Sequence, residues 1–346
     1  MPKKQSITPV SDFGEFKLIK YLTENIKLKH KTTIKGVGDD AAVIEPSDKK
    51  IVVTTDMLLE GVHFDLTYVP LKHLGYKAVV VNLSDVYAMN AIPKHITVSL
   101  GVSSKFSVEA LKDLYDGIYL ACDVYNVDLI GGDTCSSLTG LSISVTAIGE
   151  VDFEKLAYRS GAKVNDLICV TGDLGGAYMG LQLLEREKMV FNSDPNMKPK
   201  FDGYDYILQR QLKPEARKDV IELFEKNKII PTSMIDISDG LSSELLHLCN
   251  QSDVSCKIYE EKVPINYVTR KLAEELNVEP LVTALNGGED YELLFTVPIE
   301  LHDKIAELHQ VSIIGHISAK GEENLIITKG GTTLPIMAQG WAAFGE

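Results

Sequence analysis

The sequence predicts a two-domain protein of the α/β or α+β class, in which sheets are flanked by helices. Three observations support this prediction. The 346 residues exceed the usual size of one domain. Segments that alternate apolar and polar residues, typical of half-buried strands, are interspersed with segments of helical periodicity. A polar stretch at 150–161 follows a complete strand, so we expect domains at 1–152 and 153–346.

The first domain is expected to contain three helices and several strands. Ser11 and Asp12 precede apolar residues at helical spacing, which predicts a first helix from there to residue 22. The β-branched run 51–55 predicts a strand. Alternation predicts two more, at 96–100 and 142–147. The remaining predicted elements are helices at 73–90 and 111–125, and short strands at 43–44 and 129–130, the latter ending at Gly131 and Gly132.

The second domain is expected to begin with a strand at 167–171, a glycine-rich turn at 172–176 and a helix at 177–187. Two prolines and a glycine in 191–204 predict a surface loop. The other predicted elements are helices at 214–227, 241–251 and 301–309, and strands at 233–237 and 293–297.

Composition limits the classes of partner. Lys and Arg number 35 against 49 Asp and Glu, a net charge of −14, which disfavours nucleic acid and anionic membranes as partners. The five cysteines are odd in number and form no CxxC motif, so we expect free thiols in a reducing compartment. No apolar run approaches the roughly 18 residues that span a membrane. A cytoplasmic protein is predicted.

Aspartates collect where predicted elements or glycine turns end. Each has a simple structural alternative: Asp239 as a helix N-cap, and Asp39 and Asp173 as turn residues. Asp85 lies on an otherwise apolar helix and needs a partner if it is buried. Taken together they favour a shared magnesium site, because Mg²⁺ prefers hard oxygen ligands. Such a site is typical of metal-assisted phosphoryl transfer. The positions are Asp39, Asp40, Asp56, Asp85, Asp133, Asp236, Asp239, Glu289 and Asp290.

Common nucleotide-binding signatures are missing. The sequence has no GxxxxGK[ST] loop, no HRD or DFG pair, and no GxSxG nucleophile motif. The turn at 172–176 could seat an anion at a helix N-terminus, although a plain tight turn is the commoner explanation.

Seven motifs occur in an order that resembles the thiamine-monophosphate kinase family. The resemblance extends from about residue 12 to the end of the chain. The motifs are Gly-Val-Gly-Asp-Asp-Ala at 36–41, Thr-Thr-Asp at 54–56 with Gly-Val-His-Phe at 61–64, Val-Asn-Leu-Ser-Asp at 81–85, Leu-Ile-Gly-Gly-Asp-Thr at 129–134, Arg-Ser-Gly-Ala at 159–162, Asp-Ile-Ser-Asp-Gly at 236–240 and Gly-Gly-Glu-Asp-Tyr-Glu-Leu at 287–293.

The resemblance implies a two-domain α+β fold like that of aminoimidazole ribonucleotide synthetase, with mixed sheets flanked by helices. It implies that the N-terminal domain binds ATP and Mg²⁺ and pairs into a homodimer, and that the C-terminal α/β domain completes the active site. The implied reaction converts thiamine monophosphate and ATP to thiamine diphosphate and ADP.

The resemblance also implies site residues. For His63 the alternative is a structural hydrogen bond, and for Trp341 it is packing of the C-terminal tail. The implied catalytic residues are Asp56, Asp85 and Asp236. The implied magnesium ligands are Asp40, Thr54, Thr55, Asp56, Asp85, Asp133, Asp236 and Asp239; the ATP contacts are Tyr115, Gly132, Asp133, Arg159 and Ser238; and the substrate contacts are His63, Glu289 and Trp341.

Two alternatives stay open. One is another ATP-using enzyme of the superfamily, such as a cyclo-ligase or selenophosphate synthetase. The latter typically needs a reactive Cys near its N-terminus, whereas the first cysteine here is Cys122. The other is a non-catalytic nucleotide-binding relative, in which some ligand aspartates are expected to be lost.

Overall fold

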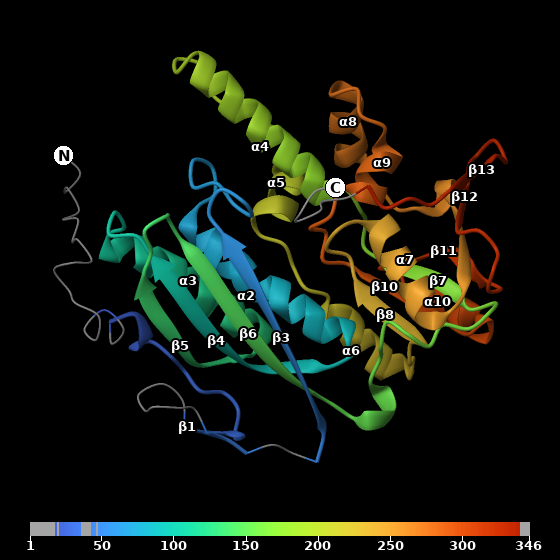
Figure 1. Cartoon of the computed structure of the whole chain (residues 1–346), viewed down its shortest axis with the longest axis horizontal. Helices are drawn as coiled ribbons and strands as arrows, with labels where there is room; N and C mark the ends of the chain where they lie inside the picture. Colours follow the sequence, from blue (N-terminus) through green and yellow to red (C-terminus); the bar gives the residue numbers. More distant parts are fainter. Residues whose placement is uncertain (1–17, 19–20, 36–42, 46–47, 340–346) are drawn as a thin grey trace. The chain divides into compact units, whose positions relative to one another are not determined.

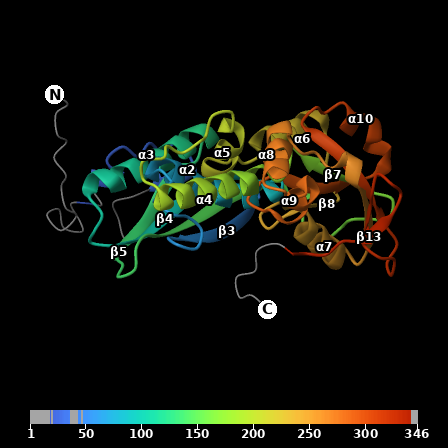
Figure 2. The ribbon, with the colours of Figure 1, turned by 90° about the horizontal axis from the view of Figure 1, so that it is seen from above.

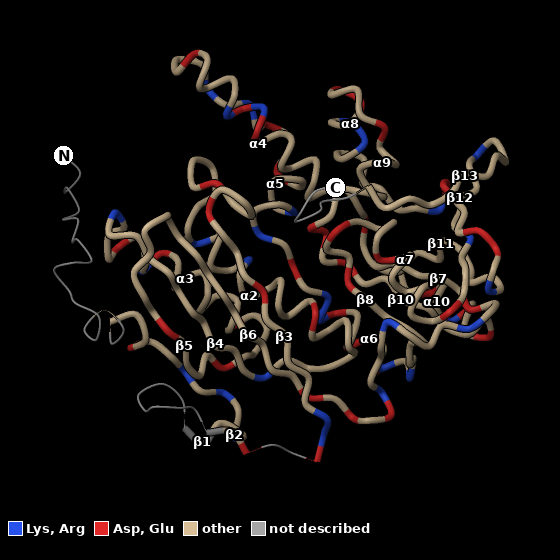
Figure 3. Tube along the Cα trace, viewed as in Figure 1, with Lys and Arg blue, Asp and Glu red and all other residues tan. Residues whose placement is uncertain are grey.

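The structure, a computed structural model, describes residues 18, 21–35, 43–45 and 48–339. The chain divides into two compact units (Figure 1). Unit 1 comprises Met1–Val86 and Ala91–Phe153, and unit 2 comprises Tyr87–Asn90 and Glu154–Glu346. Acidic and basic positions are interspersed along both units (Figure 3). Within the described ranges, no helix combines the length and the apolar character needed to cross a membrane.

Unit 1 is built on a four-stranded mixed sheet with the strand order β3-β6-β4-β5. β6 pairs antiparallel with β3 and β4, whereas β4 and β5 are parallel. A parallel pair needs a crossover connection, which a helix supplies here. The strands are β3 (Lys50–Leu59), β4 (Ile92–Val102), β5 (Asp128–Ser136) and β6 (Ser142–Val151), and β1 (Thr33–Lys35) and β2 (Val43–Ile44) form a separate pair.

Two helices, α2 (Leu71–Ala88) and α3 (Val108–Tyr125), cover one face of this sheet (Figures 1 and 2). They approach backbone to backbone. A Cβ atom built on Gly117 would lie 1.9 Å from the carbonyl oxygen of Lys72, and one on Gly75 would lie 2.0 Å from that of Leu114. This contact therefore tolerates no side chain at either glycine.

The other face of the sheet carries exposed apolar side chains. Along β3, residues alternate between the two faces. Ile51, Val53 and Met57 are exposed, with Val53 at 64%. Apolar groups therefore line a sheet face that α2 and α3 do not cover.

Unit 2 contains a seven-stranded sheet with the order β13-β12-β9-β11-β7-β10-β8. β9 and β12 are parallel, and the other neighbours are antiparallel. Strands β7, β8 and β10 are buried along their whole length. The strands are β7 (Leu167–Thr171), β8 (Ser233–Asp236), β9 (Ser255–Tyr259), β10 (Leu293–Val297), β11 (Val311–Ser318), β12 (Leu325–Ile327) and β13 (Thr333–Pro335).

The helices of unit 2 form two apolar clusters. One joins the sheet to α7 and α9 through residues such as Ile168, Ile235 and Leu245. The other joins α4, α5 and α8 through Met179 and Ile207. The helices are α4 (Gly176–Ser193), α5 (Asp205–Leu212), α6 (Lys218–Asn227), α7 (Leu241–Ser252), α8 (Tyr267–Glu275), α9 (Pro280–Asn286) and α10 (His302–Ala306).

Several predicted boundaries were wrong, including the following three. β5 continues through Gly131 and Gly132, because these glycines let the backbone lie against β4 instead of turning. The helix predicted at 214–227 begins only at Lys218, after the N-cap Arg217. Lys213, whose helical geometry is disfavoured by the following Pro214, instead ends α5. The predicted loop at 191–204 is helical as far as Ser193, where α4 ends. The mixed sheets flanked by helices nevertheless confirm the α+β class.

Candidate active site

In unit 1, β3 and α2 bring together two of the predicted carboxylates. Thr54 and Asp56 lie on the same face of β3, two residues apart. The Thr54 hydroxyl donates a hydrogen bond to Asp85 Oδ2 at 2.6 Å. The backbone N–H of Asp56 donates to Asn82 Oδ1 at 2.9 Å, and Asn82 in turn donates to the carbonyl of Ala78. The partner that Asp85 required is therefore Thr54.

The electrostatics of this cluster suit a cation. Burial, and after it the negative charge of Asp85, raises the pKa of Asp56 to about 6. Two partly desolvated carboxylates beside a hydroxyl fit Mg²⁺, which takes one or two carboxylates and fills its other positions with water or phosphate oxygens. Among the residues that the structure describes, no three His, Cys, Asp or Glu side chains gather as a complete metal site. Asp40 lies outside the described residues.

Thr55 and Asp133 lie on the opposite face of the same sheet. The Thr55 hydroxyl donates to the carbonyl of Val145 at 3.1 Å and accepts from Thr146. The register places Asp133 beside Ser99, in the row that also contains Met57. The structure does not bring these two side chains to Asp56 and Asp85.

Two other predicted residues of unit 1 have structural surroundings. Tyr115 is buried in α3 against Tyr119, with ring centroids 5.9 Å apart, and burial raises its pKa to about 12. These surroundings favour a packing role. His63 follows β3, and its Nδ1 accepts a hydrogen bond from the backbone of Leu59 at 3.1 Å. The structural hydrogen bond considered for His63 is thus present.

In unit 2, backbone contacts bring two predicted motifs together. The N–H of Glu289 donates to the carbonyl of Ser238 at 2.7 Å, and the N–H of Tyr291 donates to that of Ile237 at 2.9 Å. Asp236, the last residue of β8, is buried just before this contact. The Asp-Ile-Ser-Asp-Gly and Gly-Gly-Glu-Asp motifs therefore form one loop cluster.

Asp239 does not cap the helix that follows it. The N-cap of α7 is Gly240, without a side-chain hydrogen bond. The N–H of Asp239 instead donates to Glu244 Oε1 at 3.0 Å. Burial raises the pKa of Asp239, and the charges of His247 and Arg159 lower it, which places the predicted ATP contact Arg159 within electrostatic reach.

Glu244 was not predicted as a site residue. It is almost fully buried, and burial together with the charge of Asp239 raises its pKa to about 8. The sequence contains a weak indication of this burial, because Glu244 is a charged residue next to Leu245 among the apolar residues of α7.

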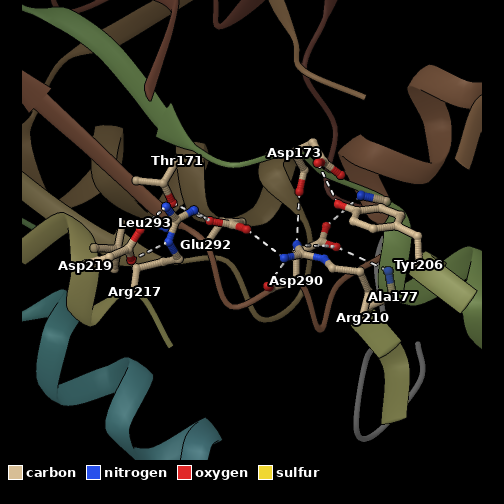
Figure 4. Close-up of polar contacts among 11 residues, drawn as sticks. Thr171, Asp173, Ala177, Tyr206, Arg210, Arg217, Asp219, Asp290, Glu292 and Leu293 are labelled. Carbon is tan, nitrogen blue, oxygen red and sulfur yellow. Dashed lines mark hydrogen bonds and ion pairs between the residues drawn. The ribbon is translucent and has the colours of Figure 1, made fainter. Parts of the chain in front are cut away.

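The glycine-rich turn before α4 binds an anionic group, which is the side-chain carboxylate of Asp290. Asp290 Oδ2 accepts from the N–H of Gly175 at 2.7 Å and its Oδ1 from that of Ala177 at 3.4 Å (Figure 4). Burial raises the pKa of Asp290 to about 6, whereas Arg210 and these N–H groups lower it. The N-terminus of α4 is therefore occupied by a carboxylate.

Two arginines complete this buried network. Arg210 Nη1 donates to Glu292 Oε1 at 2.7 Å, and Arg217 Nη1 donates to the other carboxylate oxygen (Figure 4). Tyr206 donates to Asp173 at 2.6 Å. Neither arginine belongs to a sequence motif, and the carboxylate of Glu292 that both contact lies 82 and 75 positions later in the chain.

Comparison with known proteins decides the family. Residues 38–151 match the family described as AIR synthase related protein, N-terminal domain. The chain is 36% identical over 336 residues to thiamine-monophosphate kinase of Bacillus subtilis (strain 168), covering 95% of this chain and 99% of that protein. The chain belongs to the thiamine-monophosphate kinase family. The family predicted from the sequence motifs is confirmed.

Solved structures of the thiamine-monophosphate kinase family share the fold. The enzyme from Stenotrophomonas maltophilia K279a superposes with a TM-score of 0.77 at 30% identity, covering 92% of this chain and 97% of that one. A structure described as AaThiL complexed with AMPPCP and TMP superposes with a TM-score of 0.72 at 33% identity, covering 95% and 97%. The predicted two-domain α+β architecture of this superfamily is confirmed.

Proposed function

We propose that this chain phosphorylates thiamine monophosphate to thiamine diphosphate, using ATP as the phosphoryl donor. The observation that carries the proposal is the Thr54–Asp56–Asp85 cluster, found in a chain that matches thiamine-monophosphate kinases over 95% of its length. A relative described as complexed with AMPPCP and TMP supports the same pair of substrates.

In this reaction a terminal phosphate oxygen of thiamine monophosphate forms a bond to the γ-phosphorus of ATP. The bond from that phosphorus to the β–γ bridging oxygen breaks, and ADP leaves. The attacking oxygen is already anionic at neutral pH, so the chain needs no strong general base. Its residues have to align two polyanions and offset their charge.

Magnesium is the proposed cofactor, and Asp56, Asp85, Asp236 and Asp239 are its proposed carboxylate ligands. When bound, Mg²⁺ neutralises phosphate charge and orients the oxygens for in-line transfer. Thr54 orients the carboxylate of Asp85 through its hydrogen bond. Asp40, Thr55 and Asp133 stay in the proposed ligand set on the motif resemblance alone.

The proposed nucleotide contacts are Gly132, Asp133, Arg159 and Ser238. Tyr115, whose surroundings favour packing, stays among them on the motif resemblance alone. Arg159 supplies a cation to the phosphates, and its electrostatic link to Asp239 supports this role. On the acceptor side, Glu289 and the face of Trp341 favour the cationic thiazolium ring. Trp341 lies outside the described residues. His63 is proposed as a further substrate contact.

The test is incubation of the protein with ATP, MgCl₂ and thiamine monophosphate, with thiamine diphosphate and ADP measured by chromatography. Equimolar formation of both products is the expected result. Thiamine and an unrelated phosphate monoester serve as control acceptors. Transfer to another acceptor with none to thiamine monophosphate would reject the proposal in favour of a different superfamily enzyme, and absence of any transfer would favour a binding protein.

Magnesium affinity is expected to depend on pH through Asp56. The raised pKa of about 6 means that protons compete with the metal for this carboxylate below that pH. The apparent Kd for Mg²⁺ should rise by about tenfold per pH unit below pH 6 and level off above it. Calorimetric titration of Mg²⁺ between pH 5 and 8 without nucleotide measures this, because the phosphates of a nucleotide titrate in the same range. Asp56→Asn should weaken the pH dependence, and a flat wild-type profile would contradict the assignment.

We also propose that the chain forms a homodimer through the open face of the unit 1 sheet. The exposed side chains of Ile51, Val53 and Met57 support this, because adjacent apolar groups on one face mark interaction surfaces. Light scattering should give twice the mass of one chain, and Val53→Asp should give a single-chain mass. Met189→Asp, at an exposed methionine on α4, is the control and should stay dimeric. A monomeric wild type would reject the proposal.

The proposed compartment is the cytoplasm. All five cysteines, each within the described ranges, are free thiols, as expected in a reducing environment.

A further inference from the structure

The segment that carries Glu289 has an unusual backbone. Glu289 and Tyr291 have φ angles of +57° and +53°, and Gly288, the second glycine of the motif, has +71°. A left-handed conformation is uncommon for residues other than glycine and is disfavoured for a bulky one such as Tyr. Two such residues flanking Asp290 persist only if their surroundings hold them.

One side of this segment is held by backbone hydrogen bonds to the Asp-Ile-Ser-Asp-Gly loop, as described above. The other side is held by Arg210. Its Nη2 donates to the carbonyl oxygen of Asp290 at 3.1 Å, to Asp290 Oδ1 at 3.4 Å and to the carbonyl oxygen of Asp173 at 3.0 Å (Figure 4). The guanidinium therefore contacts the main chain of the turn before α4 and that of the segment carrying Glu289.

These contacts differ from those of an ordinary buried ion pair. A buried ion pair alone is weak evidence for stability, because desolvation offsets most of its Coulomb attraction. Here the planar guanidinium also donates to two backbone carbonyl oxygens. Its donors have fixed directions and therefore restrict where these oxygens lie, which the point charge of a lysine does not do. The next residue on α5, Gln211, donates from Nε2 to Glu289 Oε2 at 2.9 Å. Helix α5 thus contacts both the backbone of this segment and the Glu289 side chain.

We propose that Arg210 is a positioning residue, which holds residues 288–291 in their left-handed backbone and thereby sets the place of the Glu289 carboxylate. The proposal rests on the proposed function, in which Glu289 contacts the thiamine substrate. Arg210 itself, enclosed by Asp173, Asp290 and Glu292, acts only through this segment.

The test uses Arg210→Lys in the full chain. Lysine keeps the positive charge and loses the fork. The KM for thiamine monophosphate should rise by about tenfold, while the KM for ATP and kcat stay within about twofold, because only uniform binding of the acceptor is weakened. Arg186→Lys, at a second arginine–carboxylate pair of unit 2, is the matched control and should leave all three constants unchanged.

A double-mutant cycle separates positioning from general loss of structure. In a Glu289→Ala background, Arg210→Lys should change the KM by less than about twofold, since the group that it positions is gone. An equal rise in both backgrounds would overturn the proposal. If Arg210→Lys does not fold, Asp290→Asn replaces it, because this variant removes the charge that Arg210 contacts and keeps an oxygen for Gly175. An unchanged KM in Asp290→Asn would also overturn the proposal.

Hydrogen exchange distinguishes failure of this proposal from failure of the proposed function. In Arg210→Lys the amides of Glu289 and Tyr291, which are bonded to Ser238 and Ile237, should exchange at least about tenfold faster. Unchanged exchange would overturn the positioning role even if the wild type is an active kinase. Faster exchange in a protein without thiamine kinase activity would support the positioning and reject the proposed function.

Discussion

Asp56→Asn is expected to lower kcat by about three orders of magnitude or more, because it removes a charged ligand from the proposed magnesium site. The side chain stands beside Asp85 on the helix-covered face of β3. An amide oxygen is a neutral and weaker ligand for a hard cation. Steady-state kinetics at saturating ATP and thiamine monophosphate measure the loss.

The same substitution should not destabilise the protein. The raised pKa of Asp56 shows that its charged form is disfavoured in the folded state, so a neutral amide relieves repulsion from Asp85 at pH 7. The Tm of Asp56→Asn without metal should equal or exceed that of the wild type. Asp113→Asn, at an exposed position of α3, is the control and should keep full activity. Near-normal turnover of Asp56→Asn at high magnesium would remove Asp56 from the site.

Gly117→Ala should cost about 3 kcal/mol or more of folding free energy, because overpacking at this contact meets backbone and not a movable side chain. The new Cβ would lie 1.9 Å from the carbonyl oxygen of Lys72, and 2.9 Å from the backbone nitrogen of Tyr76. Helices α2 and α3 would have to separate, and α2 carries Asn82 and Asp85. Activity should therefore fall together with stability.

Chemical denaturation of Gly117→Ala measures this effect. Gly101→Ala is the matched control in the same unit, since its Cβ would meet its nearest neighbour, Ser142 Cβ, at an ordinary 3.5 Å. The control should change stability by less than about 1 kcal/mol. A Gly117→Ala protein as stable as the control would show that the two helices can move apart freely.

Local pattern predicted the strands and helices whose periodicity is strong. Strands β7 and β10 were predicted with their observed limits, because both are short apolar runs between turn signals. β9 and β11 to β13 were missed, since strands such as Leu325–Ile327 are too short to show a period. Their place in the sheet depends on partners far along the chain, which no local pattern contains.

The candidate site, like the fold, could be predicted from the sequence only in part. Alternation along β3 places Thr54 and Asp56 on one face and Thr55 on the other, so this separation follows from the sequence alone. The association of Asp236 and Asp239 with Glu289 follows from motif resemblance and not from spacing. Arg210 carried no signal, because an arginine on a short amphipathic helix is usually a solvated residue. Only the folded sheet shows that it is enclosed by carboxylates.

The position of β7 within its sheet affects how the protein is made. β7 ends at Thr171, yet its two neighbours, β10 and β11, lie more than 120 residues later, and the N–H of Leu293 bonds to Thr171 across 122 positions. At a ribosomal rate of about 5 to 20 residues per second, roughly 6 to 24 seconds pass before β10 has been synthesised. During that time an apolar strand that becomes central in the sheet has neither partner. The nascent chain is therefore expected to depend on chaperones at this stage, and truncation before residue 293 should yield an aggregating product.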